Sequence, residues 1–230
     1  MHCQLECLAR CLPERLRHAL DELPLALDEV YECVLQEIDG IDWEFARRLL
    51  HCVAVAFRPL RVEELAEVLA FDFDTGPIPK YHKDWRLEDP VEVVLSTCST
   101  LLSLVEAEDS QVIQFSHFSV KEFLTSVRFA EKRSTISSRY HVSMTSAHTL
   151  VAKACLGILL DLDKDVTSDT LLEFPLAKYA AEHWFNHARF EGVSQHIKPG
   201  MLQMFDPRKA HLAVWLWICD PTIPFLERNG

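Results

Sequence analysis

Residues 101–129 read LLSLVEAEDSQVIQFSHFSVKEFLTSVRF, a sequence that predicts a hairpin directly before a helix. The mostly apolar Leu101–Val105 is followed by the polar Glu106–Ser110 and then by Val112–Phe115, where apolar and polar residues alternate. Two such runs around a polar turn are typical of a β-hairpin. Val120–Phe129 is predicted to be the helix that closes the unit.

Three helices are predicted ahead of this hairpin. The first spans residues 42–57, because Asp42 can cap its N-terminus and Pro59 stops it. Two shorter helices are predicted over residues 62–69 and 91–98. The buried stripe of the first helix is predicted to consist of Phe45, Leu49, Cys52, Val53 and Ala56.

The stretch 71–90 separates the second helix from the third and reads FDFDTGPIPKYHKDWRLEDP. Its three prolines, its glycine and its mixed charges predict a loop or a domain-swappable insertion. Three helices followed by a hairpin within about 90 residues is the order of a winged-helix domain. We therefore expect residues 41–130 to form a winged-helix domain in which the hairpin is the wing.

The regions on either side of this domain are predicted to be helical. Residues 1–40 form a helical lead-in, with an amphipathic helix over residues 23–38, LPLALDEVYECVLQEI. After a basic, Ser-rich stretch at residues 132–139, residues 140–222 are predicted to form a helical bundle. Its helices are expected over residues 148–160, 176–189 and 211–219. The predicted fold class is mainly α, with a small β-hairpin wing.

Composition limits the classes of function. The chain has 230 residues, of which 49% are apolar and 25% charged, as in soluble globular proteins. Its net charge of −12 disfavours nucleic acid and anionic membranes as partners. The longest apolar run, Leu212–Cys219, is far shorter than the roughly 20 residues of a membrane-spanning helix. Eight scattered cysteines without a secretion signal predict reduced thiols and a cytoplasmic protein.

Four stretches occur in a fixed order: LPLALDEVYECVLQEI, FSHFSVKEFL, FPLAKYAAEHWFNHAR and WLWICDP. Together they resemble the region downstream of the NACHT ATPase in fungal STAND proteins, over roughly residues 5–222. That region contains a winged-helix domain of the GPI-inositol-deacylase type and is commonly followed by ankyrin repeats. The resemblance implies a non-catalytic segment that couples the state of an upstream NACHT domain, which carries ADP or ATP, to downstream repeats. It implies these intramolecular partners, and oligomerisation on activation.

The resemblance also implies a nucleotide-sensing role for His117. In such families a His at the start of the last winged-helix helix reaches the bound phosphate, within a Met-His-Asp motif in some relatives. Here Ser116 and Phe118 stand on either side of His117, so the Asp that supports the imidazole has no evident replacement. The alternative is that His117 simply caps local backbone at a strand-to-helix junction.

The sequence lacks the motifs of the enzyme classes most relevant to this resemblance. A P-loop requires a Gly-Lys pair, and none occurs. A serine hydrolase of the deacylase kind requires Gly-x-Ser-x-Gly, which is also missing. We therefore predict that the chain is not an enzyme, with no catalytic residue and no cofactor of its own.

Three sets of side chains have the spacing of metal ligands. His183 and His187 stand one helical turn apart, but no third ligand is marked, and a packed aromatic face with Trp184 is the preferred interpretation. The other two sets lack the remainder of a metal motif: Cys3, Cys7 and Cys11, and Asp161, Asp163 and Asp165. We predict no metal site.

A winged helix can also bind DNA, but the charges here oppose it. The candidate recognition helix, VEVVLSTC, has one charged residue, Glu92, and the wing carries three carboxylates. Residues 41–130 hold 9 Lys/Arg against 15 Asp/Glu. We therefore expect a protein partner, with Glu92, Trp215 and Trp217 as interface residues. A free-standing protein-interaction module is the alternative function, and a DNA-binding regulator is the third.

Overall fold

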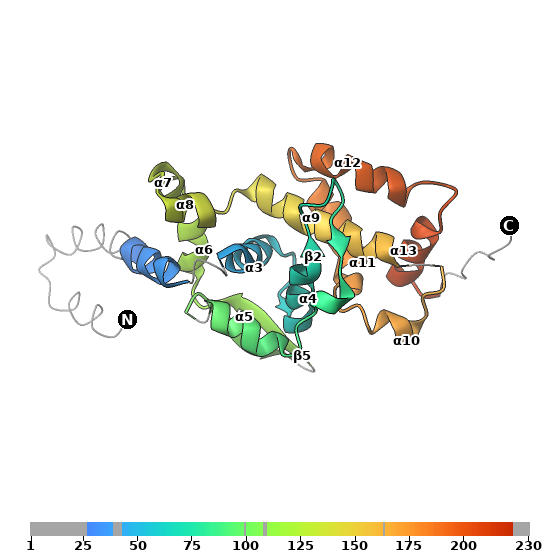
Figure 1. Ribbon diagram of the computed structural model, residues 1–230, viewed down its shortest axis with the longest axis horizontal. Coiled ribbons are helices and arrows are strands. Elements are labelled where there is room, and N and C mark those ends of the chain that lie inside the picture. Colours follow the sequence, from blue (N-terminus) through green and yellow to red (C-terminus); the bar gives the residue numbers. More distant parts are fainter. Residues whose placement is uncertain (1–26, 39–42, 99, 108–109, 163, 223–230) are drawn as a thin grey trace, which may run out of the picture.

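A computed structural model describes residues 27–38, 43–98, 100–107, 110–162 and 164–222. Its fold is mainly α with small antiparallel sheets, which confirms the predicted fold class (Figure 1). Most of the predicted lead-in, including Cys3, Cys7 and Cys11, lies outside the described residues.

The N-terminal half follows the predicted order of three helices and a hairpin. A helix over residues 27–37 precedes it. The elements that follow are α3 (Trp43–Val55), β1 (Leu60–Arg61), α4 (Val62–Glu67), η1 (Val68–Ala70), α5 (Pro90–Cys98), β4 (Leu102–Ala107), β5 (Ser110–Phe115), α6 (Phe118–Thr125) and α7 (Val127–Glu131). Two ion pairs attach the first helix to α7, Asp28 with Arg128 at 3.5 Å and Glu32 with Lys132.

The hairpin is confirmed and belongs to a three-stranded sheet of order β1-β5-β4. β4 and β5 pair in register from Leu102↔Phe115 to Ala107↔Ser110, and Leu60 of β1 pairs with Ile113 of β5. The strand β1 was not predicted, because two residues show no alternation that periodicity can detect.

Two details of the predicted helices are wrong. Phe45 is 41% exposed, and the buried face of α3 is centred one residue later, on Ala46, Leu49 and Leu50. The predicted helix over residues 120–129 is in fact two helices, because Ser126 has an extended backbone (φ −72°, ψ 142°). The Ser126 hydroxyl accepts from Phe129 N at 3.1 Å, so it caps α7 and separates it from α6.

The stretch 71–90, predicted to be a loop or an insertion, instead packs against the bundle. β2 (Phe71–Asp72) pairs with β3 (Lys80–Tyr81), and a short 3-10 helix, η2 (Lys83–Trp85), follows. We call residues 71–81 the arm. A Cβ at Gly157 of the bundle would lie 2.6 Å from Phe71 Cε1 of the arm and 3.2 Å from Pro79 O, so only glycine allows this approach.

The C-terminal half contains helices joined by loops and no strand among its described residues. It comprises α8 (Thr135–Tyr140), α9 (Met144–Asp161), α10 (Ser168–Leu171), α11 (Leu176–Ala188), α12 (Val193–Met204) and α13 (His211–Cys219). The helices α8, α10 and α12 were not predicted. Figure 1 shows α9 running between the end that holds α5, α6 and α7 and the end that holds α12 and α13. None of the described helices combines the length and apolar character that crossing a bilayer requires.

α4 buries two glutamates, of which Glu67 joins the halves. The Glu67 carboxylate accepts from Arg86 Nη2 at 2.7 Å, from Tyr81 OH at 2.9 Å, and from the backbone N of Leu176, the first residue of α11, at 2.7 Å. Glu64 accepts from Arg58 through both carboxylate oxygens, at 2.7 and 2.8 Å. The buried apolar residues of both halves form one continuous cluster. The predicted boundaries, 1–40, 41–130 and 140–222, stay predictions.

Candidate functional site

His117 lies between β5 and α6 and is the N-cap of α6. Its Nδ1 accepts a hydrogen bond from Ser119 N at 3.3 Å and lies 2.6 Å from Ser119 Oγ. The hydroxyl of Tyr31, from the helix over residues 27–37, lies 2.6 Å from the same Ser119 Oγ. Backbone capping, the alternative given to His117 by the sequence, is therefore part of what this side chain does.

The cap determines which nitrogen of His117 can donate. Because Nδ1 accepts from an N–H group, a neutral imidazole must carry its proton on Nε2. Among the described residues, both hydrogen bonds of His117 use Nδ1. Ser119 and Tyr31 hold the ring in place, as the missing motif Asp would. Sequence reasoning missed them, since Tyr31 is 88 residues from Ser119 along the chain.

An exposed aromatic ring stands beside His117. Phe118 is 68% exposed, and its ring centroid lies 4.4 Å from that of His117. A large exposed apolar side chain next to an oriented donor suits contact with another protein surface better than contact with a polyanion.

Glu92, predicted as an interface residue, is exposed on α5. Its backbone N donates to Asp89 Oδ1 at 2.9 Å, so Asp89 helps to start the helix. Glu106 on the wing is also exposed and accepts from Gln111 Nε2 at 2.6 Å. The described parts of α5 and the wing thus present carboxylates to the outside.

The two predicted tryptophans are half-buried on α13. Trp215 Nε1 donates to Ala181 O at 2.9 Å, and its ring lies 5.3 Å from that of the buried Trp184. Leu212 and Leu216 are the large apolar residues that α13 exposes. An interface role for Trp215 and Trp217 stays a prediction.

The histidines of α11 pack against Phe57 and Tyr179, whereas Trp184, which was predicted to share their face, packs against Phe185, Phe205 and Trp215. His187 is fully buried; its Nδ1 lies 2.8 Å from His148 Nδ1, and its Nε2 lies 2.9 Å from Tyr179 OH. Burial, with His148 and His183 adding to it, lowers the pKa of His187 to about 3. In the described part of the chain, no three His, Cys, Asp or Glu side chains are grouped as a metal site would require.

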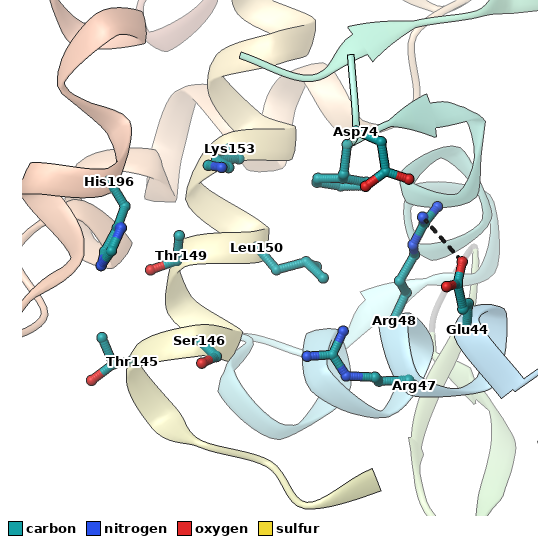
Figure 2. A pocket seen from close by; sticks show the side chains of 11 residues that line it. Glu44, Arg47, Arg48, Asp74, Thr145, Ser146, Thr149, Leu150, Lys153 and His196 are labelled. Carbon is teal, nitrogen blue, oxygen red and sulfur yellow. Dashed lines mark ion pairs between the residues drawn. The ribbon is translucent and has the colours of Figure 1, made fainter. Parts of the chain in front are cut away.

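Two adjoining cavities between α3 and the start of α9 were not predicted. The first has a volume of about 380 Å³ and is bordered by α3, α9, α12 and the arm (Figure 2). The second, of about 340 Å³, is lined by Arg47, His51, Arg133 and His141 and by serines of α8 and α9. Arg47 and Ser146 border both cavities. The basic, Ser-rich stretch at residues 132–139 was the available signal, but only the fold brings it to α3.

Known proteins match two overlapping parts of the chain. Residues 24–135 match the family described as "GPI inositol-deacylase, winged helix domain", which confirms the resemblance inferred from the sequence. Over 176 residues the chain is 31% identical to "Azaphilone pigments biosynthesis cluster protein L" of Monascus ruber. That alignment covers 73% of this chain and 36% of the relative, so the chain spans little more than a third of the relative's length. No solved structure matches the chain.

Proposed function

We propose a regulatory function on the premise that residues 24–135 match the GPI inositol-deacylase winged-helix domain, which is non-catalytic. The chain acts as the non-catalytic regulatory segment of a STAND/NACHT-type signalling ATPase in the cytoplasm. It couples the nucleotide state of an upstream NACHT domain to downstream repeats, for which ankyrin repeats are the expected type.

The orientation of His117 is the observation that carries the proposal. The Ser119 cap leaves Nε2 as the donor that can reach a phosphate oxygen on a neighbouring domain. A hydrogen bond to a charged group contributes about 1.5–3 kcal/mol. That is enough to shift an equilibrium between closed and open forms about tenfold or more. ADP would therefore favour the form in which the winged helix lies against the ATPase.

The junction on α4 provides a path from His117 to the bundle. Glu67 binds the first backbone N–H of α11, and Arg61 Nη2 donates to Pro175 O at 3.2 Å. With a continuous core beneath these contacts, the winged-helix domain and the bundle are expected to move as one body. A displacement at α6 would then reach α13 and whatever follows it.

A free-standing protein-interaction module is the second candidate function. The exposed apolar residues of α12 and α13, Leu202, Leu212 and Leu216, favour it, because such side chains commonly mark contact surfaces. Both candidates expect a protein partner. The exposed carboxylates of α5 and the wing argue against a DNA-binding regulator.

The test uses the intact longer protein that contains this segment. Its upstream sequence is examined for a P-loop, and the dissociation rate of bound ADP is measured for wild type and for His117→Ala. We expect ADP to leave about tenfold faster or more from the variant. Lys121→Ala, which removes an exposed cation from the same helix, serves as the control and should leave the rate unchanged. Equal ADP release from His117→Ala and wild type, with unchanged signalling output, would remove the role of His117, whereas a missing P-loop would favour the free-standing module.

A further inference from the structure

The second of the two cavities has an unusual charge for this chain. The whole protein carries a net charge of −12, yet no Asp or Glu is among the described residues that line this cavity. Arg47 and Arg133 contribute two guanidinium groups, and His51 and His141 contribute two imidazoles. Of the four serines in the lining, Ser137 and Ser138 already donate their hydroxyl hydrogens to Ser134 O, so the hydroxyls that can donate to a ligand are those of Ser143 and Ser146. Such a lining favours an oxyanion.

His51 lines this cavity and is 1% exposed. Its ring lies near the His141 backbone, but neither Nδ1 nor Nε2 makes a hydrogen bond of good geometry among the described atoms. A buried polar group without a partner is unfavourable and calls for a group that satisfies it. In the adjoining cavity, the buried Thr149 Oγ1 has no hydrogen-bond partner either. Each cavity therefore offers a buried polar group that an entering ligand could satisfy.

Arg47 is the cation shared by both cavities. Glu44, one turn of α3 earlier, forms its ion pair with Arg48 at 3.9 Å and not with Arg47. Figure 2 shows Glu44 and Asp74 on the side of Arg48, while the Arg47 side chain extends toward the first turns of α9, where Ser146 lies. Arg47 thus points a half-buried positive charge at the boundary between the cavities.

The start of α9 adds donors to the same place. This helix is 18 residues long, and its N-cap, Ser143, makes no side-chain capping bond. Ser143 and Ser146 both line the second cavity, so the positive end of the helix dipole faces it. Arg133 reaches the cavity from a left-handed backbone conformation, with φ of 49°.

We propose that this pocket binds the phosphate group of a small phosphorylated molecule. The phosphate lies between Arg47, Arg133 and the start of α9 and accepts a hydrogen bond from His51. The organic part extends into the first cavity, where Thr149, Lys153 and His196 provide polar contacts and Leu150 an apolar one. Volumes of about 340 and 380 Å³ suit a small molecule and not a folded domain. This site is separate from the proposed contact of His117 with an ATPase.

The first experiment is calorimetric titration of the full 230-residue chain with inorganic phosphate and with ribose 5-phosphate. Ribose, and sodium chloride at matched ionic strength, are the reference ligands. We expect both phosphates to bind, ribose 5-phosphate more tightly, and ribose not at all. Tighter binding of inorganic phosphate than of the ester would overturn the role of the first cavity. Heat from chloride equal to that from phosphate would overturn the whole site.

Matched variants test the residues. Arg47→Gln should weaken phosphate binding about tenfold or more, because it removes a charge-assisted contact. Arg133→Gly should weaken it as well while relieving the left-handed backbone. Arg139→Gln is the control, since Arg139 lies on α8 outside both linings and stacks on Trp43. An equal loss of affinity in all three variants would mean general electrostatic attraction and would overturn the site.

A second measurement does not depend on any variant. Phosphate added to the wild-type chain should shift the nuclear magnetic resonance signals of the His51 and His141 rings. The His148 and His187 rings, which hydrogen-bond each other in the bundle, should not respond. Unshifted His51 signals at saturating phosphate would contradict the proposal.

Discussion

The α4 junction of the winged-helix region and the interior of the helical bundle bury polar groups in opposite ways. In the winged-helix region, α4 buries two carboxylates, Glu64 and Glu67, against arginines and backbone N–H groups. In the bundle, α9 and α11 bury two imidazoles, His148 and His187, next to Tyr179. Charge thus holds the junction between the two regions, while neutral hydrogen bonds hold the interior of the bundle.

The hydrogen bonds around His187 explain why this imidazole is neutral. Phe57 N donates to Tyr179 OH at 3.3 Å, which leaves the Tyr179 hydroxyl hydrogen for His187 Nε2. His187 Nδ1–H can then donate to His148 Nδ1. Every donor in this series has an acceptor only if His187 is neutral. Burial raises the pKa of a carboxyl group, and hydrogen bonds to the carboxylate lower it. Burial has the larger effect on Glu67 and raises its pKa, whereas the hydrogen bonds from Arg58 and Arg61 outweigh burial and lower the pKa of Glu64.

The largest effect is expected from a substitution that breaks the charged junction. Glu67→Ala removes the acceptor of Arg86, Tyr81 and Leu176 N. Removing one partner of a buried ion pair costs about 3–5 kcal/mol, and we expect about 3 kcal/mol because Arg86 is partly exposed. Urea unfolding measures it. Glu63→Ala, at an exposed position of the same helix, should change stability by less than about 0.5 kcal/mol. Equal losses would show that the contacts of Glu67 do not stabilise the junction.

The next effect is the pH dependence of stability that follows from burying His187 in its neutral form. With a pKa of about 3 for folded His187 and an ordinary value of 6.5, the unfolded chain binds more protons between these values. The free energy of unfolding therefore falls as pH falls through that window, by about 1–2 kcal/mol between pH 6.5 and pH 5 from His187 alone. Urea unfolding of His187→Gln at several pH values should show a correspondingly smaller dependence. The exposed Lys178→Gln on the same helix should keep the full dependence, and identical slopes for both variants would contradict neutral burial.

A smaller effect tests the packing of the arm on the bundle. Gly157→Ala places a Cβ 2.6 Å from Phe71 Cε1 and 3.2 Å from Pro79 O. Overpacking costs about 1–3 kcal/mol, and the better helix propensity of Ala returns up to about 1 kcal/mol, so we expect a loss of about 1 kcal/mol. Gly76→Ala is the control, because the nearest atom to its Cβ would be Ile78 O at 3.9 Å. A lower melting temperature for Gly76→Ala than for Gly157→Ala would mean that the arm packs loosely on the bundle.

The smallest effect on stability concerns the cap of α6. Ser119→Ala removes the hydroxyl between Tyr31 and His117. We expect a loss below about 1 kcal/mol in urea unfolding of this chain. In the longer protein, ADP should leave the Ser119→Ala variant several-fold faster than it leaves the wild type. The double variant with Ser119→Ala and His117→Ala should release ADP no faster than His117→Ala alone. Additive effects of the two substitutions would contradict a positioning role of Ser119.

The predictable parts of the fold were those with a clear periodicity. The hairpin and the helices around Leu49 and Trp184 follow from apolar spacing in a single segment. The helix break at Ser126 is decided by one side-chain bond, and α12 is hidden by Pro199 within it, so periodicity found neither. The two-residue strand β1 forms only because β5 lies beside it.

The candidate sites were predictable only where one residue carries the signal. His117 could be found because it stands at a strand-to-helix junction in a recognisable stretch. Tyr31 joins it from a distant helix, and the cavity around Arg47 collects residues from α3, α8 and α9. Such groupings depend on how helices pack, which a single sequence does not disclose.

If the winged helix and the bundle respond to nucleotide as one body, amide hydrogen exchange of the longer protein will differ with and without ADP in both regions. We expect ADP to change the protection of α6 and also of α11 and α13, and Glu67→Ala to confine the change to α6. A response to ADP that never extends beyond α6 in the wild-type protein would contradict this expectation.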